Sequence, residues 1–93
     1  MNGLRTRGPA PTLGRVADFL STHPGFVNAR RMSGMTLLHL AAMQGRVDWA
    51  ASLLAFGANV NAKDDGGWTP LFHAFVNGQM QMVRFLRSHG AVV

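Results

Sequence analysis

Two five-residue stretches, Gly34-Met35-Thr36-Leu37-Leu38 and Gly67-Trp68-Thr69-Pro70-Leu71, lie 33 residues apart and decide how this chain folds. The same offset aligns further residues of matching type: Ala41 with Ala74, Gly45 with Gly78, Leu53 with Leu86, and Gly57-Ala58 with Gly90-Ala91. Upstream it places Val27-Asn28-Ala29 on Val60-Asn61-Ala62, and Leu20 on Leu53. Self-similarity at a fixed period of this size is typical of repeat architectures. We therefore predict two nearly complete copies of one unit, preceded by half of a third.

Each copy is predicted to form two helices joined by a turn. The first helix is expected over 37–44 and 70–77, and the second over 47–56 and 80–89. Thr36 and Thr69 stand where an N-cap is needed, since a threonine hydroxyl can accept from backbone N–H groups of the first turn. Pro70 suits the first helical position, where its missing N–H costs nothing. Gly45 and Gly78 follow the first helices, where a left-handed residue commonly ends a helix.

The segments outside these helix pairs also show patterns. Asp64-Asp65-Gly66-Gly67 has strong turn chemistry, which predicts an extended, hairpin-like loop over 58–67. Residues 13–22 form one amphipathic helix that matches the second helix of a preceding unit. On the last helix, the spacing of the apolar residues predicts Met80 as a core residue, where methionine fills gaps.

The residues that carry the period are similar to those of a known family. Thr36-Leu37-Leu38-His39-Leu40-Ala41-Ala42, followed by Leu53-Leu54 and Gly57-Ala58-Asn59-Val60-Asn61-Ala62, resembles an ankyrin repeat, and Gly67-Trp68-Thr69-Pro70-Leu71 opens a second one. The resemblance covers residues 13–93. It implies an all-α ankyrin-repeat solenoid of about two and a half helix-turn-helix repeats with projecting hairpin-like loops. It also implies that His39 hydrogen-bonds neighbouring backbone and threonine.

The chain departs from the family pattern at four positions. The first repeat has Leu37 in place of proline, and the second has Phe72, Phe75 and Arg87 in place of histidine, alanine and leucine. The last repeat becomes bulkier and more polar through Phe75 and Arg87 together with Gln79, Gln81 and Arg84. Because nothing covers the outer face of a terminal repeat, we interpret the last repeat as a partial cap.

The domain organisation follows from the same pattern. Residues 1–11 hold glycines, prolines and arginines without an apolar period, and we expect a disordered basic tail. Residues 12–93 form the repeat domain, divided into a partial repeat 12–31, a repeat 32–64 and a repeat 65–93. One repeat cannot bury its own apolar face. The sequence therefore leaves open a homo-oligomer, stabilisation by a partner, and a place in a longer repeat array.

Composition limits the class of protein. The 93 residues carry a net charge of +5 and no cysteine, and no stretch is long and apolar enough for a signal peptide or a membrane span. We expect an intracellular, cytoplasmic protein. The basic residues are scattered, with only Arg30 and Arg31 adjacent, which favours a solvated surface over a nucleic-acid site.

No pattern of catalytic residues is visible. The chain has four histidines and no glutamate, and no two histidines have the spacing of helix-borne metal ligands. Two adjacent carboxylates, Asp64 and Asp65, are a poor cation site without further spaced oxygen ligands, so we interpret them as turn residues. No glycine-rich phosphate loop is present. We predict a protein that is not an enzyme, with no catalytic residue, no metal and no cofactor.

The resemblance assigns partner contact to the loop tips and to the first helix of each repeat, which we call the inner helix. Carried over position by position, the candidate contact residues are Arg30, Met32, Ser33, Met35, Met43 and Gln44 in the first full repeat and Lys63, Asp65, Trp68, Val76 and Asn77 in the second. Trp68 and Met35 are the expected anchors, and tryptophan is enriched among residues that dominate binding. In the alternative interpretation, Trp68 packs over its own turn.

The predicted function is therefore a non-enzymatic protein-protein interaction module with a concave binding face. An acidic protein is the expected partner, because Arg30, Arg31 and Lys63 lie near that face. We do not expect binding to a membrane. The alternative function is a basic nucleic-acid-associated adaptor that uses the arginine-rich tail and surface, which would show steep salt dependence.

Overall fold

The computed structural model of this chain describes residues 13–92, and every regular element within that range is a helix. The elements are α1 (Leu13–Thr22), the 3-10 turns η1 (Pro24–Asn28) and η2 (Met32–Gly34), α2 (Leu37–Gln44), α3 (Val47–Ala55), α4 (Pro70–Val76) and α5 (Met80–Ser88). The predicted all-α class is confirmed, and each predicted helix agrees to within one residue at both ends. The tail predicted over residues 1–11 lies outside the described residues.

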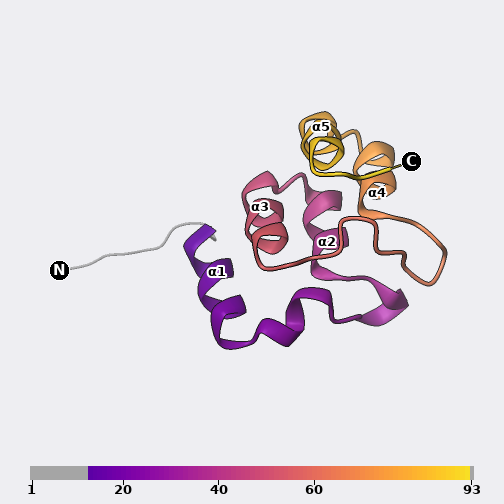
Figure 1. Cartoon of the computed structure of the whole chain (residues 1–93). Helices are drawn as coiled ribbons and strands as arrows, with labels where there is room; N and C mark the ends of the chain where they lie inside the picture. The colour runs from indigo at the N-terminus through magenta and orange to yellow at the C-terminus, as the bar shows by residue number, and fades with distance from the viewer. Residues whose placement is uncertain (1–12, 93) are drawn as a thin grey trace.

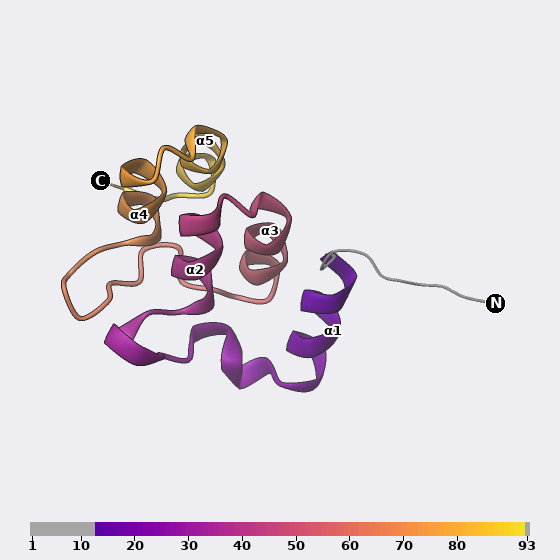
Figure 2. The ribbon, with the colours of Figure 1, turned by 180° about the vertical axis from the view of Figure 1, so that it is seen from behind.

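The helices stand in two rows, as Figure 1 and the reverse view in Figure 2 show. One row contains α1, α3 and α5, and the other contains α2 and α4, with contacts between successive members of each row. Two loops project on the same side of the stack. We call residues 30–35 the first finger and residues 63–68 the second finger. Within residues 13–92, no helix has the length and apolar character needed to cross a bilayer.

The predicted threonine N-caps and the glycine at the end of α2 are observed. The Thr36 hydroxyl accepts from the His39 N–H at 3.4 Å, and the Thr69 hydroxyl accepts from the Phe72 N–H at 3.2 Å, so both threonines are N-caps. Gly45 follows α2 with a φ of 70°. In that left-handed region a side chain is unfavourable, which explains a glycine at this position.

Asparagine side chains fix the spacing of the stack. Asn28 donates to the Gly57 carbonyl oxygen at 3.0 Å, and Asn61 donates to the Gly90 carbonyl oxygen at 3.2 Å. Each asparagine also accepts the backbone N–H two residues beyond that glycine, at 2.7 and 3.0 Å. The two sets of bonds are 33 residues apart. The segment after α1 is therefore in register with the later repeats.

The core runs along the interface between the two rows. Its largest aliphatic side chains are fully buried: Leu20, Leu38, Leu53 and Leu86. Ala41, Ala42 and Ala74 are also completely buried, and these small side chains allow α2 and α4 to approach closely. The predicted leucine register across the repeats is thus observed.

The prediction that Met80 is a core residue is wrong. Its side chain is 51% exposed, whereas Met82 is 1% exposed and lies in the core. The spacing of the apolar residues on this helix placed Met80 with Val83 and Leu86 and did not single out Met82. Packing of α5 on α4 and α3 buries Met82, Val83 and Leu86. Met80 lines the outer side of the last repeat, which no other helix among residues 13–92 covers.

Candidate partner-binding surface

The predicted contact residues lie mostly at the surface. Nine of the eleven are exposed: Arg30, Met32, Ser33, Gln44, Lys63, Asp65, Trp68, Val76 and Asn77. Met35 and Met43 are partly buried. Six of the exposed residues belong to the two fingers, and three lie at the ends of α2 and α4. Exposure makes these residues accessible to a partner, and their role in binding stays a prediction.

The two fingers are joined to each other by hydrogen bonds. The Asp65 N–H donates to the Ser33 carbonyl oxygen at 2.9 Å. The Arg30 guanidinium donates to the carbonyl oxygens of Gly34 and Lys63, so it bridges both fingers. Arg30 therefore has a structural role that the sequence did not reveal, because the carbonyl oxygens it contacts are brought together only by the stacking. The fingers present one continuous surface in place of two independent loops.

Asp64 organises the tip of the second finger. One carboxylate oxygen accepts from the backbone N–H groups of Gly66 and Trp68, both at 2.9 Å. The Asp64 N–H donates to the Trp68 carbonyl oxygen at 3.0 Å, which closes the hairpin-like tip. The interpretation of Asp64 as a turn residue is confirmed. A side chain that bonds its own backbone a few residues ahead is a common turn device.

Trp68 stacks on Phe72 and still faces solvent. The two ring centroids are 3.9 Å apart with an interplanar angle of 14°, and 45% of Trp68 remains exposed. The ring also lies close to Gly66, where an added Cβ would be 3.0 Å from the indole. Trp68 thus packs over its own turn with one face and offers the other to solvent. The two interpretations from the sequence are compatible, and a pre-positioned aromatic ring loses little entropy on binding.

The ends of the inner helices continue the surface beyond the fingers. Val76 is 57% exposed, and Asn77 donates from its side chain to the His73 carbonyl oxygen at 2.8 Å. The Met43 carbonyl oxygen accepts from the Gln79 side chain at 3.1 Å, which ties the turn after α2 to the next repeat. The Met43 backbone is therefore held by the next repeat.

His39 has a structural role. Its Nδ1 accepts from the Thr36 N–H at 3.0 Å, so its Nε2 carries the proton and donates to the Trp68 carbonyl oxygen at 2.8 Å. The side chain is completely buried. Burial lowers the pKa of His39 below its ordinary value of 6.5, and the bond to Trp68 opposes this only in part. The neutral ring links the start of α2 to the second finger, as the resemblance implied.

Sequence reasoning missed a second histidine contact. His73 Nε2 lies 2.8 Å from the Asp64 carboxylate, whose side chain is only 7% exposed. Burial raises the pKa of Asp64, but hydrogen bonds from His73, Trp68 and Gly66 outweigh it and hold that pKa below its ordinary value of 3.8. The only signal in the sequence was that His73 follows the position equivalent to His39. The finger therefore rests on α4 through a charged hydrogen bond.

His39, Asp64 and His73 have ligand atoms within 4.8 Å of one another, which is the spacing of a metal site. Their hydrogen bonds argue against that use. A metal on Nε2 of His39 would displace the proton that bonds Trp68, while Nδ1 must still accept from Thr36. A neutral imidazole has only one nitrogen lone pair for both tasks. We therefore assign these three residues to holding the second finger in place.

Comparisons with known proteins agree with this architecture. The family model described as ankyrin repeats (3 copies) matches residues 13–93. The chain therefore belongs to the ankyrin repeat family. Ankyrin repeats are generally protein-binding modules, and the repeat fold itself is not catalytic.

The similar proteins have diverse activities. The chain is 39% identical over 77 residues to the serine/threonine-protein kinase VIK of Arabidopsis thaliana, covering 83% of this chain and 18% of the kinase. It is 33% identical over 79 residues to protein phosphatase 1 regulatory subunit 27 of Homo sapiens, covering 85% of this chain and 51% of that subunit. The chain thus spans about half or less of these relatives. What they share with it is the repeat region.

Proposed function

We propose that this chain is a non-enzymatic protein-interaction module whose partner binds across the two fingers and the ends of α2 and α4. One observation carries the proposal. Trp68 is held by Phe72 and by the Asp64 turn while 45% of it faces solvent. An exposed aromatic ring that is already ordered is the type of residue that dominates protein interfaces. Met32, 85% exposed on the first finger, adds a second apolar contact.

The charge of the fingers favours an acidic partner. Arg30, Arg31 and Lys63 are exposed around the finger tips, and Asp65 is the exposed acidic residue among them. Complementary charge at the rim of an interface mainly raises the association rate and selects the partner. One of the similar proteins is a regulatory subunit of a phosphatase. A role of this kind, in which the module binds an enzyme without catalysing a reaction, fits the proposed surface.

A pull-down with paired variants tests the proposal. Trp68→Ser removes the finger aromatic, and Phe75→Ser removes a comparably exposed aromatic at the end of the stack. Both proteins should first show wild-type helicity by circular dichroism. We expect a partner retained by Phe75→Ser and lost with Trp68→Ser, with affinity reduced by about 2 kcal/mol or more.

Other outcomes of the same pull-down would assign binding elsewhere. Equal recovery with wild type and Trp68→Ser would exclude the finger surface. Recovery that disappears after nuclease treatment, and that falls steeply with salt, would support the nucleic-acid adaptor instead. Loss with Phe75→Ser alone would place the partner on the end of the stack.

A further inference from the structure

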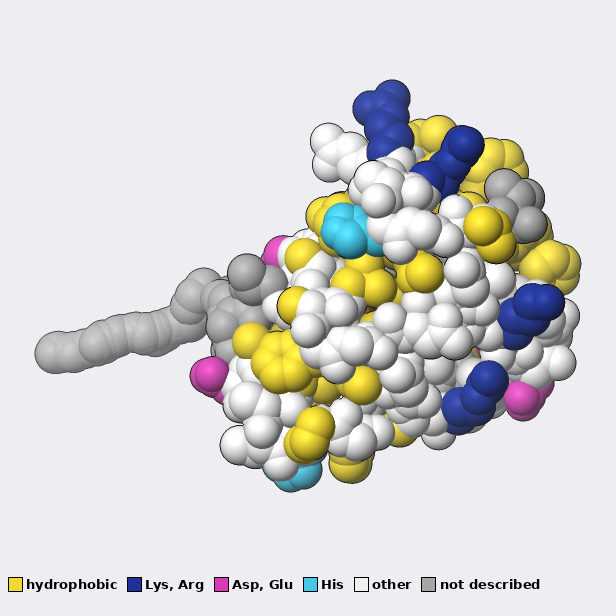
Figure 3. All heavy atoms as spheres, viewed as in Figure 1, with side chains coloured by type: hydrophobic (Ala, Val, Ile, Leu, Met, Phe, Trp, Pro, Cys, Tyr) yellow, Lys and Arg dark blue, Asp and Glu magenta, His cyan; other side chains and the backbone are white. Residues whose placement is uncertain are grey.

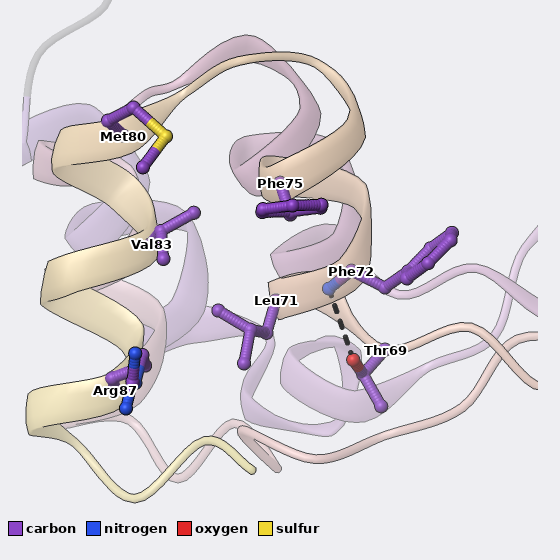
Figure 4. A pocket seen from close by; sticks show the side chains of 7 residues that line it. All are labelled: Thr69, Leu71, Phe72, Phe75, Met80, Val83 and Arg87. Carbon is purple, nitrogen blue, oxygen red and sulfur yellow. Dashed lines mark hydrogen bonds between the residues drawn. The ribbon is translucent and has the colours of Figure 1, made fainter. Parts of the chain in front are cut away.

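The last repeat carries an open apolar groove on its outer side. The groove has a volume of about 360 Å³ and is lined by Thr69, Leu71, Phe72, Phe75, Met80, Val83 and Arg87. Figure 4 shows Leu71 and Phe75 from α4 facing Val83 and Met80 from α5. Leu71 and Val83 form a buried floor, whereas Phe75 is 62% exposed and Met80 is 51% exposed. Two large apolar side chains thus stand at the surface on either side of a hollow.

The preceding repeat shows what this groove is shaped to receive. The residues 33 positions earlier are Thr36, Leu38, His39, Ala42, Val47, Ala50 and Leu54. Five of these seven are at most 2% exposed, and the other two are partly buried. What covers them is a helix pair, because α4 contacts α2 and α5 contacts α3. The groove is the same face one repeat later, and no helix among the described residues covers it. It therefore has the geometry of a surface that binds helices.

The two repeats differ at two positions on this face. Phe75 stands where the covered repeat has Ala42, and Arg87 stands where it has the partly buried Leu54. An alanine lets the next helix approach closely, whereas a phenylalanine holds it further away and offers a larger apolar contact. An arginine at the rim adds a cation that can pair with a carboxylate.

The charged residue among those that line the groove is Arg87, and α5 also carries the exposed Arg84. Figure 3 shows basic and hydrophobic side chains side by side at the α5 end of the stack. Docking of a second copy would bring together two chains that each carry a net charge of +5. Like charges brought together at an interface are unfavourable. The occupant favoured by this charge is acidic.

We propose that the groove between α4 and α5 binds an amphipathic helix of a partner protein, with the apolar side of that helix on Leu71, Phe75, Met80 and Val83 and an acidic border next to Arg87. This mode of recognition lays one apolar helix face into a groove. The site lies at the end of the stack and adjoins the second finger, because Phe72 lines the groove and stacks on Trp68. It does not rest on the binding proposed for the fingers. The module would then have two surfaces for partners.

The test uses the full chain labelled with 15N and two synthetic peptides of about 18 residues, long enough to form helix. Both peptides carry leucine and alanine at three- and four-residue spacing, one with glutamate along the borders and the other with lysine. We expect saturable shifts of backbone amides in α4 and α5, with the glutamate peptide binding about tenfold more tightly than the lysine peptide.

Two charge reversals on the same helix separate docking from general attraction. Arg87→Glu should invert the preference between the peptides, because its side chain lines the groove. Arg84→Glu makes the same charge change and should leave the glutamate peptide preferred. Phe75→Ser should weaken both peptides. These residues are exposed, and a melting curve for each variant will show that the fold is retained.

The proposal has definite ways to fail. It is overturned if neither peptide produces saturable shifts at millimolar concentration, or if the shifts centre on the fingers. Equal effects of Arg84→Glu and Arg87→Glu would show attraction by net charge alone. Shifts of the same amides on concentrating the chain without peptide would identify a second copy as the occupant.

Discussion

The two full repeats of this molecule follow one pattern in different surroundings. The first has a neighbour on each side, with α1 contacting α3 and the α4–α5 pair covering the other face. Within the described part of the chain, the second has a neighbour on one side only. Ala42 is completely buried, and its equivalent Phe75 is 62% exposed. Whether a small or a large side chain suits this position of the repeat therefore depends on whether another helix packs against it.

The turns differ in the same way as the helices. A Cβ added at Gly45 would lie 2.3 Å from the Gln79 side chain, whereas one added at Gly78 would meet nothing within 4 Å. Both glycines have the same left-handed backbone, with φ of 70° and 72°. The local requirement for glycine is thus shared, and the tertiary requirement applies only to the covered repeat.

The largest expected effect comes from the leucines that fill the core in both repeats. Leu53→Ala and Leu86→Ala should each lower the free energy of unfolding by about 2–5 kcal/mol, because both side chains are at most 1% exposed. We expect the greater loss for Leu53→Ala, since α3 contacts α1, α2 and α5. Urea titration monitored by circular dichroism measures both values. Equal losses would mean that the end repeat is packed as tightly as the middle one.

Ala42 and Phe75 occupy the same position in the two repeats, so replacing each by the other tests the comparison directly. Ala42→Phe should destabilise the fold by roughly 1–3 kcal/mol or more, because α4 leaves no room for the larger ring. Phe75→Ala should cost well under that, since the ring is mostly in solvent. Thermal melts of both variants provide the measurement. A Phe75→Ala variant as unstable as Ala42→Phe would show that the two faces are packed alike.

The buried histidine gives a third contrast. His39→Phe copies the residue at the equivalent position, Phe72, and leaves the Trp68 carbonyl oxygen and the Thr36 N–H without their partner. Unsatisfied buried groups of this kind cost about 1–3 kcal/mol. The reverse change, Phe72→His, should have a smaller effect because Phe72 is only partly buried. Denaturant midpoints for the two variants would reveal the opposite order if His39 were dispensable.

The same histidine should make stability depend on pH. Folding lowers the pKa of His39 below 6.5. As the pH falls through 6.5, the His39 side chain therefore binds a proton more readily in the unfolded chain than in the folded one. The contribution of His39 to the free energy of unfolding should therefore be fully present above pH 6.5 and should decline below it. The contribution of Asp64, whose pKa is also lowered, should decline below pH 3.8. The first decline should be reduced in His39→Phe, and an identical pH profile for this variant would contradict the assignment.

The smallest contrast concerns the turn glycines. Gly45→Ala and Gly78→Ala should each lose about 1 kcal/mol, because both force an alanine into the left-handed region. Gly45→Ala should lose more, since the new methyl group displaces Gln79 from its bond to the Met43 carbonyl oxygen. Paired urea titrations would resolve the difference. If the two losses are the same, the Gln79 contact contributes nothing measurable.

The sequence predicted the features that depend on local structure. The 33-residue period, the threonine caps and the glycine turns located each helix to within a residue, because capping and turn preferences act over a few neighbouring residues. The candidate contact residues were carried over position by position from the resemblance to ankyrin repeats. Nine of them are exposed, and their binding role awaits the experiments above.

Other features arose only when segments of the chain packed together. The hydrogen bond between His73 and Asp64, the bridge from Arg30 to the second finger and the exposure of Met80 all depend on which segments lie side by side. Periodicity marks an apolar face but does not say whether a neighbouring helix covers it. By itself, the sequence therefore determined the repeat and its helices. Only the tertiary structure decided which faces are buried and which remain open, because burial depends on contacts between residues distant in the chain.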